Sequence, residues 1–138
     1  MKNNDFLLNV KDALVPSHRH LCLVLDYFIE NPIDRLEILH GKDYCGCEED
    51  ACCFDHGSVD YLNVNSKVII SLTCDDDLLL APPEFYYYLR LIYNRFLQHN
   101  YPQTEKDEFA AGLDYFRNAC KIECDENGDP ILEGYTHA

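Results

Sequence analysis

The chain has 138 residues, enough for one domain with its own apolar core, and we expect residues 1–138 to form a single domain. Its 25 acidic and 11 basic residues give a formal net charge of −14, which disfavours nucleic acid and favours basic partners. No apolar run near the N-terminus is long enough for a signal peptide or a membrane helix. We therefore expect a cytoplasmic location, no membrane contact and reduced thiols.

Two amphipathic helices are expected first, over residues 5–14 and 18–30. Apolar residues recur in both with a period close to 3.6. Asp5 and Ser17 are suited to cap them, and Pro16 separates them.

A third, short helix is expected over residues 32–40. Asn31 is suited to cap it, Pro32 to be its first residue and Gly41 to follow its end. The apolar pattern of this segment would suit a strand equally, so both interpretations stay open at this point.

Residues 41–57 follow no helical or strand period, and Gly, Asp, Glu and Cys dominate them. Irregular connections of this length in compact domains are usually functional or held by a ligand. This loop is therefore the first candidate site.

A small, mainly antiparallel sheet is expected between residues 59 and 81. Its predicted strands are residues 59–64, 67–74 and 78–81, with 131–135 as a candidate edge strand. The first two would form a tight hairpin at Asn65-Ser66. Both faces of the second strand are largely apolar, so it should be central.

Two further helices are expected to pack on this sheet, over residues 83–99 and 105–120. The apolar period changes from 2 to 3.6 at Pro82-Pro83, and Thr104 is suited to cap the last helix. Together these elements predict an α+β fold. Tyr87 and Leu91 lie on the polar face of the helix expected over residues 83–99, which indicates either an internal contact or a binding surface.

Six metal-ligand side chains fall within seventeen residues of the irregular loop: His40, Cys45, Cys47, Cys52, Cys53 and His56. Cys45, Cys47, Cys52 and His56 would serve as a tetrahedral zinc site, although their spacing departs from the usual knuckles. The alternative is a solvated acidic loop with packed thiols. No other cofactor is expected.

Acidic side chains are the main candidates for binding. Residues 43–89 hold ten carboxylates and one base, Lys67. No Gly-rich loop or placed nucleophile accompanies them, so we expect a binding protein rather than an enzyme. The candidate partner-binding residues are Asp43, Glu48, Glu49, Asp50, Asp55, Asp60, Asp75, Asp76 and Asp77, with Tyr87 and Leu91 as anchors.

In overall profile the chain resembles the immunity proteins of bacterial toxin systems, such as contact-dependent growth inhibition. The acidic residues from Asp43 to Asp60 and from Asp75 to Asp77 carry this resemblance, without a diagnostic motif. The resemblance implies a protein that neutralises a basic toxin, foremost a nuclease. A zinc-binding adaptor that uses residues 40–56 and a nucleic-acid mimic that blocks DNA-binding proteins are the alternatives.

Overall fold

A computed structural model describes residue 25, residues 30–42, residues 51–71 and residues 78–131 of the chain. The helix expected over residues 5–14, most of the one over 18–30 and residues 132–135 of the candidate edge strand lie outside these ranges. Leu25 is helical and fully buried.

The described residues form an α+β fold, as predicted, with three helices and one antiparallel sheet. The sheet has the order β1-β2-β3, formed by Ala51–Asp55, Lys67–Ser71 and Leu78–Leu80. The central position predicted for the second strand is confirmed, because β2 pairs with β1 on one side and β3 on the other.

One strand prediction is wrong. Residues 59–64 form a loop, and the partner of β2 is β1, which lies inside the segment expected to be irregular. Cys52 and Phe54 are alternate residues of β1, so both side chains point to the same face of the sheet, and both are buried in the core.

Helix α2, Pro32–Leu39, has the ends that its sequence predicts. The side chain of Asn31 accepts hydrogen bonds from the backbone N–H groups of Ile33 (3.1 Å) and Asp34 (3.5 Å). Gly41 follows with a φ of 75° in the left-handed region, which ends the helix and turns the chain.

Helices α3, Pro82–Leu97, and α4, Gln103–Ala119, match the two predicted long helices. Phe109, Leu113 and Phe116 form the buried stripe of α4, but Thr104 does not cap the helix as predicted, because Pro102 occupies the cap position. Lys121 ends α4 with a φ of 51°, a conformation usually given to glycine.

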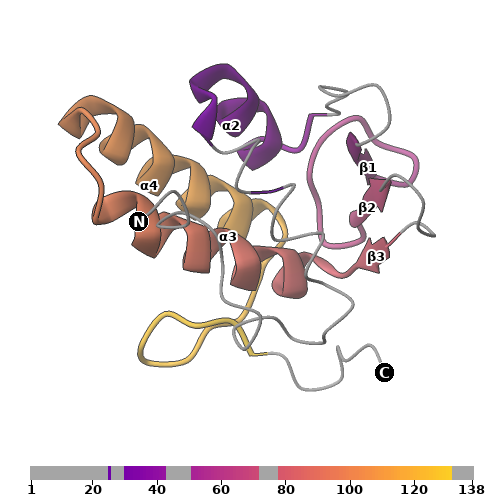
Figure 1. Cartoon of the computed structure of the whole chain (residues 1–138). Helices are drawn as coiled ribbons and strands as arrows, with labels where there is room; N and C mark the ends of the chain where they lie inside the picture. The colour runs from indigo at the N-terminus through magenta and orange to yellow at the C-terminus, as the bar shows by residue number, and fades with distance from the viewer. Residues whose placement is uncertain (1–24, 26–29, 43–50, 72–77, 132–138) are drawn as a thin grey trace.

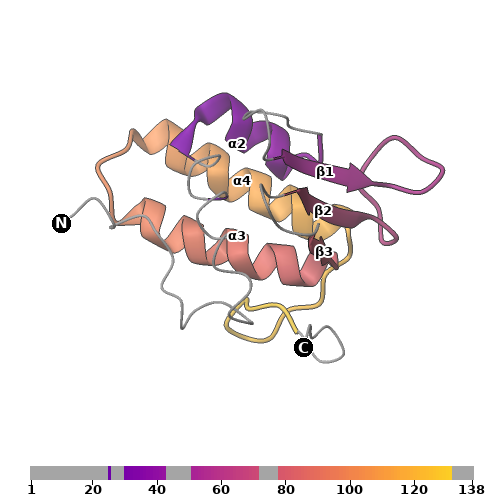
Figure 2. The ribbon, with the colours of Figure 1, turned by 45° about the vertical axis from the view of Figure 1, so that its right-hand side comes forward.

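Helix α4 lies between α2 and α3, and α3 and α4 run antiparallel side by side (Figure 1). The sheet sits at the end of this helical layer where α3 begins and α4 ends, as both views show (Figure 2). Phe85 of α3 joins the parts of the core, with ring centroids 6.0 Å from Phe54 of the sheet and 5.7 Å from Phe116 of α4.

A fully buried cation joins the three helices. Arg35 of α2 donates from Nη2 to Oε1 of Glu105 at 3.0 Å. Its guanidinium carbon lies 4.7 Å from the ring centroid of Phe96 and 5.8 Å from that of Phe109. The charge is therefore compensated by one carboxylate and two aromatic faces.

Candidate functional site

The two most acidic segments of the sequence join the sheet at the same end. Ala51, the first residue of β1, pairs with Ser71, the last residue of β2, and Ile70 pairs with Leu78 at the start of β3. Residues 43–50 run into the sheet at Ala51, and residues 72–77 connect Ser71 to Leu78. Paired Cα atoms in such a ladder lie about 5 Å apart, so the attachment points of the two segments are adjacent.

Seven of the nine predicted binding carboxylates belong to these two segments: Asp43, Glu48, Glu49, Asp50, Asp75, Asp76 and Asp77. The seven side chains themselves lie outside the described residues.

The other two carboxylates lie toward the opposite end of the sheet. Asp55 closes β1, where it pairs with Lys67, and Asp60 is in the loop that follows. Strand β1 has five residues, so its first and last Cα atoms are four steps, or about 13 Å, apart. The side chain of Asp55 accepts a hydrogen bond from the backbone of Gly57 (3.0 Å). The acidic surface expected from the sequence is thus divided between the two ends of the sheet.

Residues 56–66, which we name the β1–β2 loop, are held by their own polar side chains. His56 Nε2 lies 3.0 Å from the carbonyl oxygen of Gly41, and Nδ1 lies 2.8 Å from Ser66 Oγ. Because a carbonyl only accepts, the neutral ring carries its hydrogen on Nε2, and Nδ1 accepts from the Ser66 hydroxyl. The same hydroxyl oxygen accepts from the backbone N–H of Asn63 at 3.0 Å. This chain of hydrogen bonds connects the two ends of the loop to Gly41, two residues after the end of α2.

Asn63 is the centre of the same loop. Its side-chain nitrogen donates to the carbonyl oxygens of His56 and Tyr61, both at 3.0 Å, and its side-chain oxygen accepts from the backbone N–H of Asn65 at 2.8 Å. Leu62, 2% exposed, anchors the loop in the core. The outward side chains, among them Tyr61, are therefore presented from a fixed backbone.

The proposed zinc ligands have different surroundings. Cys52 is fully buried in β1, and both ring nitrogens of His56 are engaged within the β1–β2 loop. Cys45 and Cys47 lie outside the described residues. Within the described ranges, no group of three or more His, Cys, Asp or Glu side chains has the arrangement of a metal site.

Cys120, which directly follows α4, is a core side chain. It is 6% exposed, and burial raises the pKa of its thiol to about 12. A thiol held protonated in this way is a poor nucleophile at neutral pH.

Tyr87 and Leu91, the predicted anchors, are half-buried and pack against the core. The Tyr87 ring meets the ring of Tyr88 edge-on, with centroids 5.3 Å apart. The internal contact that was one of the two interpretations of this pair is therefore present, and only the remaining part of each side chain faces outward.

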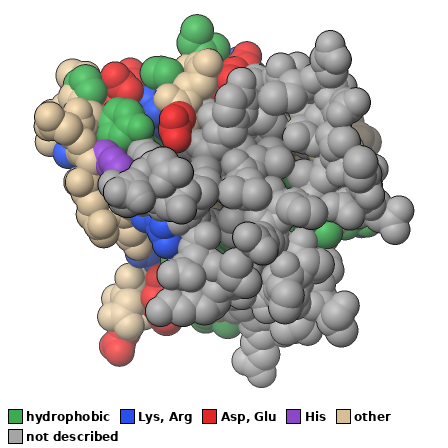
Figure 3. All heavy atoms as spheres, viewed as in Figure 1, with side chains coloured by type: hydrophobic (Ala, Val, Ile, Leu, Met, Phe, Trp, Pro, Cys, Tyr) green, Lys and Arg blue, Asp and Glu red, His purple; other side chains and the backbone are tan. Residues whose placement is uncertain are grey.

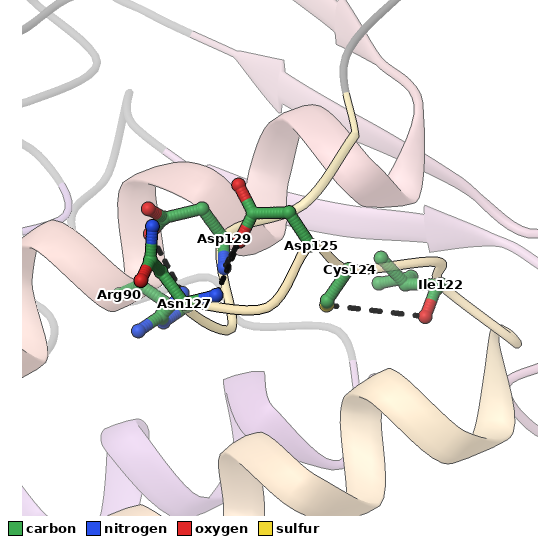
Figure 4. Close-up of polar contacts among 6 residues, drawn as sticks. All are labelled: Arg90, Ile122, Cys124, Asp125, Asn127 and Asp129. Atoms are coloured by element: carbon green, nitrogen blue, oxygen red, sulfur yellow. Dashed lines mark hydrogen bonds and ion pairs between the residues drawn. The ribbon is translucent and has the colours of Figure 1, made fainter.

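A tight turn ties the C-terminal segment to α3. Asp125 accepts from the backbone N–H groups of Asn127 (2.9 Å) and Asp129 (3.0 Å), and Arg90 of α3 pairs with Asp129 at 2.7 Å (Figure 4). Asp, Asn and Gly residues are typical of such turns. An isolated bridge between Cys124 and Pro130 closes it.

Sequence reasoning missed four exposed apolar side chains: Tyr61, Val64, Leu79 and Ile131. The strand predicted over residues 59–64 gives no indication that Tyr61 and Val64 are both exposed. The Asn and Ser residues around them were the available signal, because their side chains compete with strand pairing for the backbone.

On the face seen in Figure 3, acidic, basic and hydrophobic side chains alternate over the described part of the surface. None of the described helices combines the length and the apolar composition needed to cross a membrane. Comparisons with protein-family models, with curated proteins and with solved structures find no match to this chain.

Proposed function

We propose that this chain is an immunity-type inhibitor, which binds a basic toxin domain and blocks it, with a nuclease as the toxin class. Binding would use the carboxylates of residues 43–50 and 72–77. Asp55 and Asp60 would act as secondary contacts at the other end of the sheet.

The observation that carries the proposal is the register of the sheet. Ala51 pairs with Ser71, and Leu78 follows on the neighbouring strand, so chain connectivity tethers both acidic segments to one end of a three-stranded support. The six carboxylates nearest in sequence to these attachment points are Glu48, Glu49, Asp50, Asp75, Asp76 and Asp77. Six charges attached close together produce a stronger local potential than the same charges spread over the surface.

Such a concentration of charge matches what a nuclease cleft offers. A cleft that binds phosphates is lined with Lys and Arg, and its low-dielectric walls focus the positive potential. Carboxylates steered into it would raise the association rate and occupy the positions of substrate phosphates. Inhibition would then be steric, and no chemical step by the inhibitor is required.

The test takes the products of the genes next to this one as candidate partners and measures their association by surface plasmon resonance. For a basic partner we expect the association rate to fall markedly between about 0.05 M and about 0.15 M salt, while the dissociation rate changes less. Nuclease activity of the partner, and survival of cells that express it, report inhibition.

A charge-reversal variant separates recognition from general charge. Glu48→Lys, Glu49→Lys and Asp50→Lys together should weaken binding at least about a hundredfold if these side chains enter the cleft. The matched control reverses three exposed carboxylates elsewhere, Glu108, Asp114 and Glu126, and changes the net charge equally. Equal effects of the two triple variants, or full protection by the first, would refute recognition by this end of the sheet.

A further inference from the structure

Exposed apolar side chains gather beside the β1–β2 loop. Val64, Leu79 and Ile131 are 52%, 56% and 44% exposed, and all three line one hollow of about 840 Å³. Tyr61, 63% exposed, lies three residues before Val64 in the same loop. Apolar surface collected around a concavity, unlike scattered single residues, marks an interaction site.

We name this hollow the β3 groove. Its walls come from the end of the β1–β2 loop, strand β3, the first turn of α3 and the segment after α4; the lining includes Val64, Lys67, Leu79, Glu84, Ile122 and Ile131. The volume lies within the range of sites that receive a side chain or a small ligand. Four separate segments therefore build one cavity at the junction of sheet and helices.

The first turn of α3 offers no free backbone donor to an anion in the groove. Pro82 and Pro83 at the start of α3 have no backbone N–H. The N–H groups of Glu84 and Phe85 both donate to the carbonyl oxygen of Ala81, at 3.0 and 3.1 Å. The first turn of α3 thus directs none of these donors toward a phosphate, in contrast to an ordinary helix N-terminus.

The loop next to the groove is built for contact. Residues 56–66 contain Tyr, Ser, Gly and three Asn or His side chains, and the hydrogen bonds of Asn63 and His56 fix their backbone. The loop projects away from the helices (Figure 2). A large, stiff aromatic side chain on an ordered loop gives contact area at low cost in conformational entropy.

Charge indicates the kind of partner. Exposed Asp60 and Glu123 lie on the loop and the groove, while Lys67 and Lys121 also line the groove, so the local charge is close to balanced. The net charge of −14 therefore decides the long-range preference, which is for a basic protein.

We infer that the β3 groove and the β1–β2 loop form a protein-docking surface that receives a bulky apolar side chain from a segment of a basic protein, with exposed Tyr61 of the loop as a second contact. The inference rests on the proposed function for the class of partner. It assigns the apolar part of that recognition to residues separate from the acidic segments.

The experiment selects a phage-displayed library of random peptides on the full-length protein, so that it needs no knowledge of the toxin. We expect enriched peptides to carry a bulky apolar residue beside Lys or Arg. A synthetic copy of the strongest one should lose at least about tenfold in affinity to Tyr61→Ala and to Leu79→Ser, as expected for anchor positions.

Matched controls are available on the helices. Tyr115, 42% exposed on α4, and Leu97, 41% exposed at the end of α3, take the same substitutions, Tyr115→Ala and Leu97→Ser. Both should keep the affinity of the wild-type protein within about twofold. Thermal unfolding of all four variants shows whether each is folded, and exposed sites should change stability little.

Three results would overturn the inference: no enriched peptide, enriched peptides rich in Asp and Glu, or peptides that bind equally to the Tyr61 and Leu79 variants. Light scattering that shows a dimer of the wild-type protein, lost in Tyr61→Ala, would instead assign the surface to self-association. The outcome is separable from the proposed function. If a basic toxin binds in a salt-dependent way but no peptide is enriched, only the docking surface is refuted. If peptides bind this surface but no neighbouring gene encodes a basic partner, only the proposed toxin is refuted.

Discussion

The buried ion pair between Arg35 and Glu105 should be the least replaceable polar interaction among the described residues. Arg35 is fully buried, whereas the Glu105 side chain is 28% exposed. Removing the carboxylate leaves a desolvated cation beside two aromatic rings, while removing the cation leaves an anion that water can reach. The two single substitutions should therefore differ in cost.

The magnitudes follow from these surroundings. Removing one partner of a buried ion pair typically lowers the free energy of unfolding by about 3–5 kcal/mol. Because Glu105 is partly exposed, we expect about 2–3 kcal/mol for Glu105→Gln. Arg35→Met keeps the buried stem but loses a charged hydrogen bond and the ring contacts, together about 2 kcal/mol. The double variant should cost about as much as Arg35→Met alone, so the coupling energy should equal the cost of Glu105→Gln, about 2–3 kcal/mol.

Urea unfolding of the wild-type protein, both single variants and the double variant measures this cycle. Asp129→Asn is the control, because the pair of Asp129 with Arg90 is exposed at 62% and 23% and should contribute less than about 1 kcal/mol. If Glu105→Gln stays within about 0.5 kcal/mol of the wild-type value, or the two single costs add, Arg35 is not a buried charge that depends on Glu105.

Two further predictions concern packing and pH. A Cβ atom at position 112 would lie 2.6 Å from Cδ1 and 3.0 Å from Cβ of Leu39, so Gly112→Ala should force α2 and α4 apart. Overpacking of about 1–3 kcal/mol should exceed the roughly 1 kcal/mol gained in helix propensity, and a raised urea midpoint would contradict this. Burial raises the pKa of the Cys120 thiol from an ordinary value of 9.0 to about 12. Between these values the unfolded chain loses this proton while the folded protein keeps it, so the free energy of unfolding should fall as pH rises. Cys120→Ala should flatten that decline in unfolding curves recorded from pH 8 upward; an equally steep decline would assign it to other groups, such as Tyr86, whose pKa burial also raises.

The helices were predictable because their signals are local. Asn31, Pro32 and Gly41 mark both ends of α2 through hydrogen bonds and a positive φ that depend on a few neighbouring residues. The buried stripes of α3 and α4 follow from the apolar period alone.

The first strand was not predictable in the same way. Cys52 resembles a metal ligand in a sequence rich in Cys and His, and only the pairing of Cys52 with Ile70 reveals it as a core residue. Residues 59–64 have the apolar residues of a strand, but Asn63 and Ser66 take the backbone hydrogen bonds that a ladder would need. Such competition depends on tertiary position.

The candidate site was predictable in charge and not in geometry. The carboxylates of residues 43–50 and 72–77 are evident from the sequence, but their attachment to one end of the sheet depends on the pairing of Ala51 with Ser71. Tyr87 stood out on the helical wheel, whereas the far more exposed Tyr61 did not, because exposure in a loop has no periodic signal.

The contact of α2 with α4 has a consequence for how the chain folds. Arg35 and Glu105 are 70 residues apart, whereas α3 and α4 are joined by residues 98–102 and β2 is separated from β3 by a short connection. Closing the long segment costs more chain entropy than closing the short ones, so the sheet edge with α3 and α4 should assemble first. Helix α2 should dock late onto that preformed surface. The ion pair of Arg35 with Glu105 would then form after the folding transition state and would mainly slow unfolding.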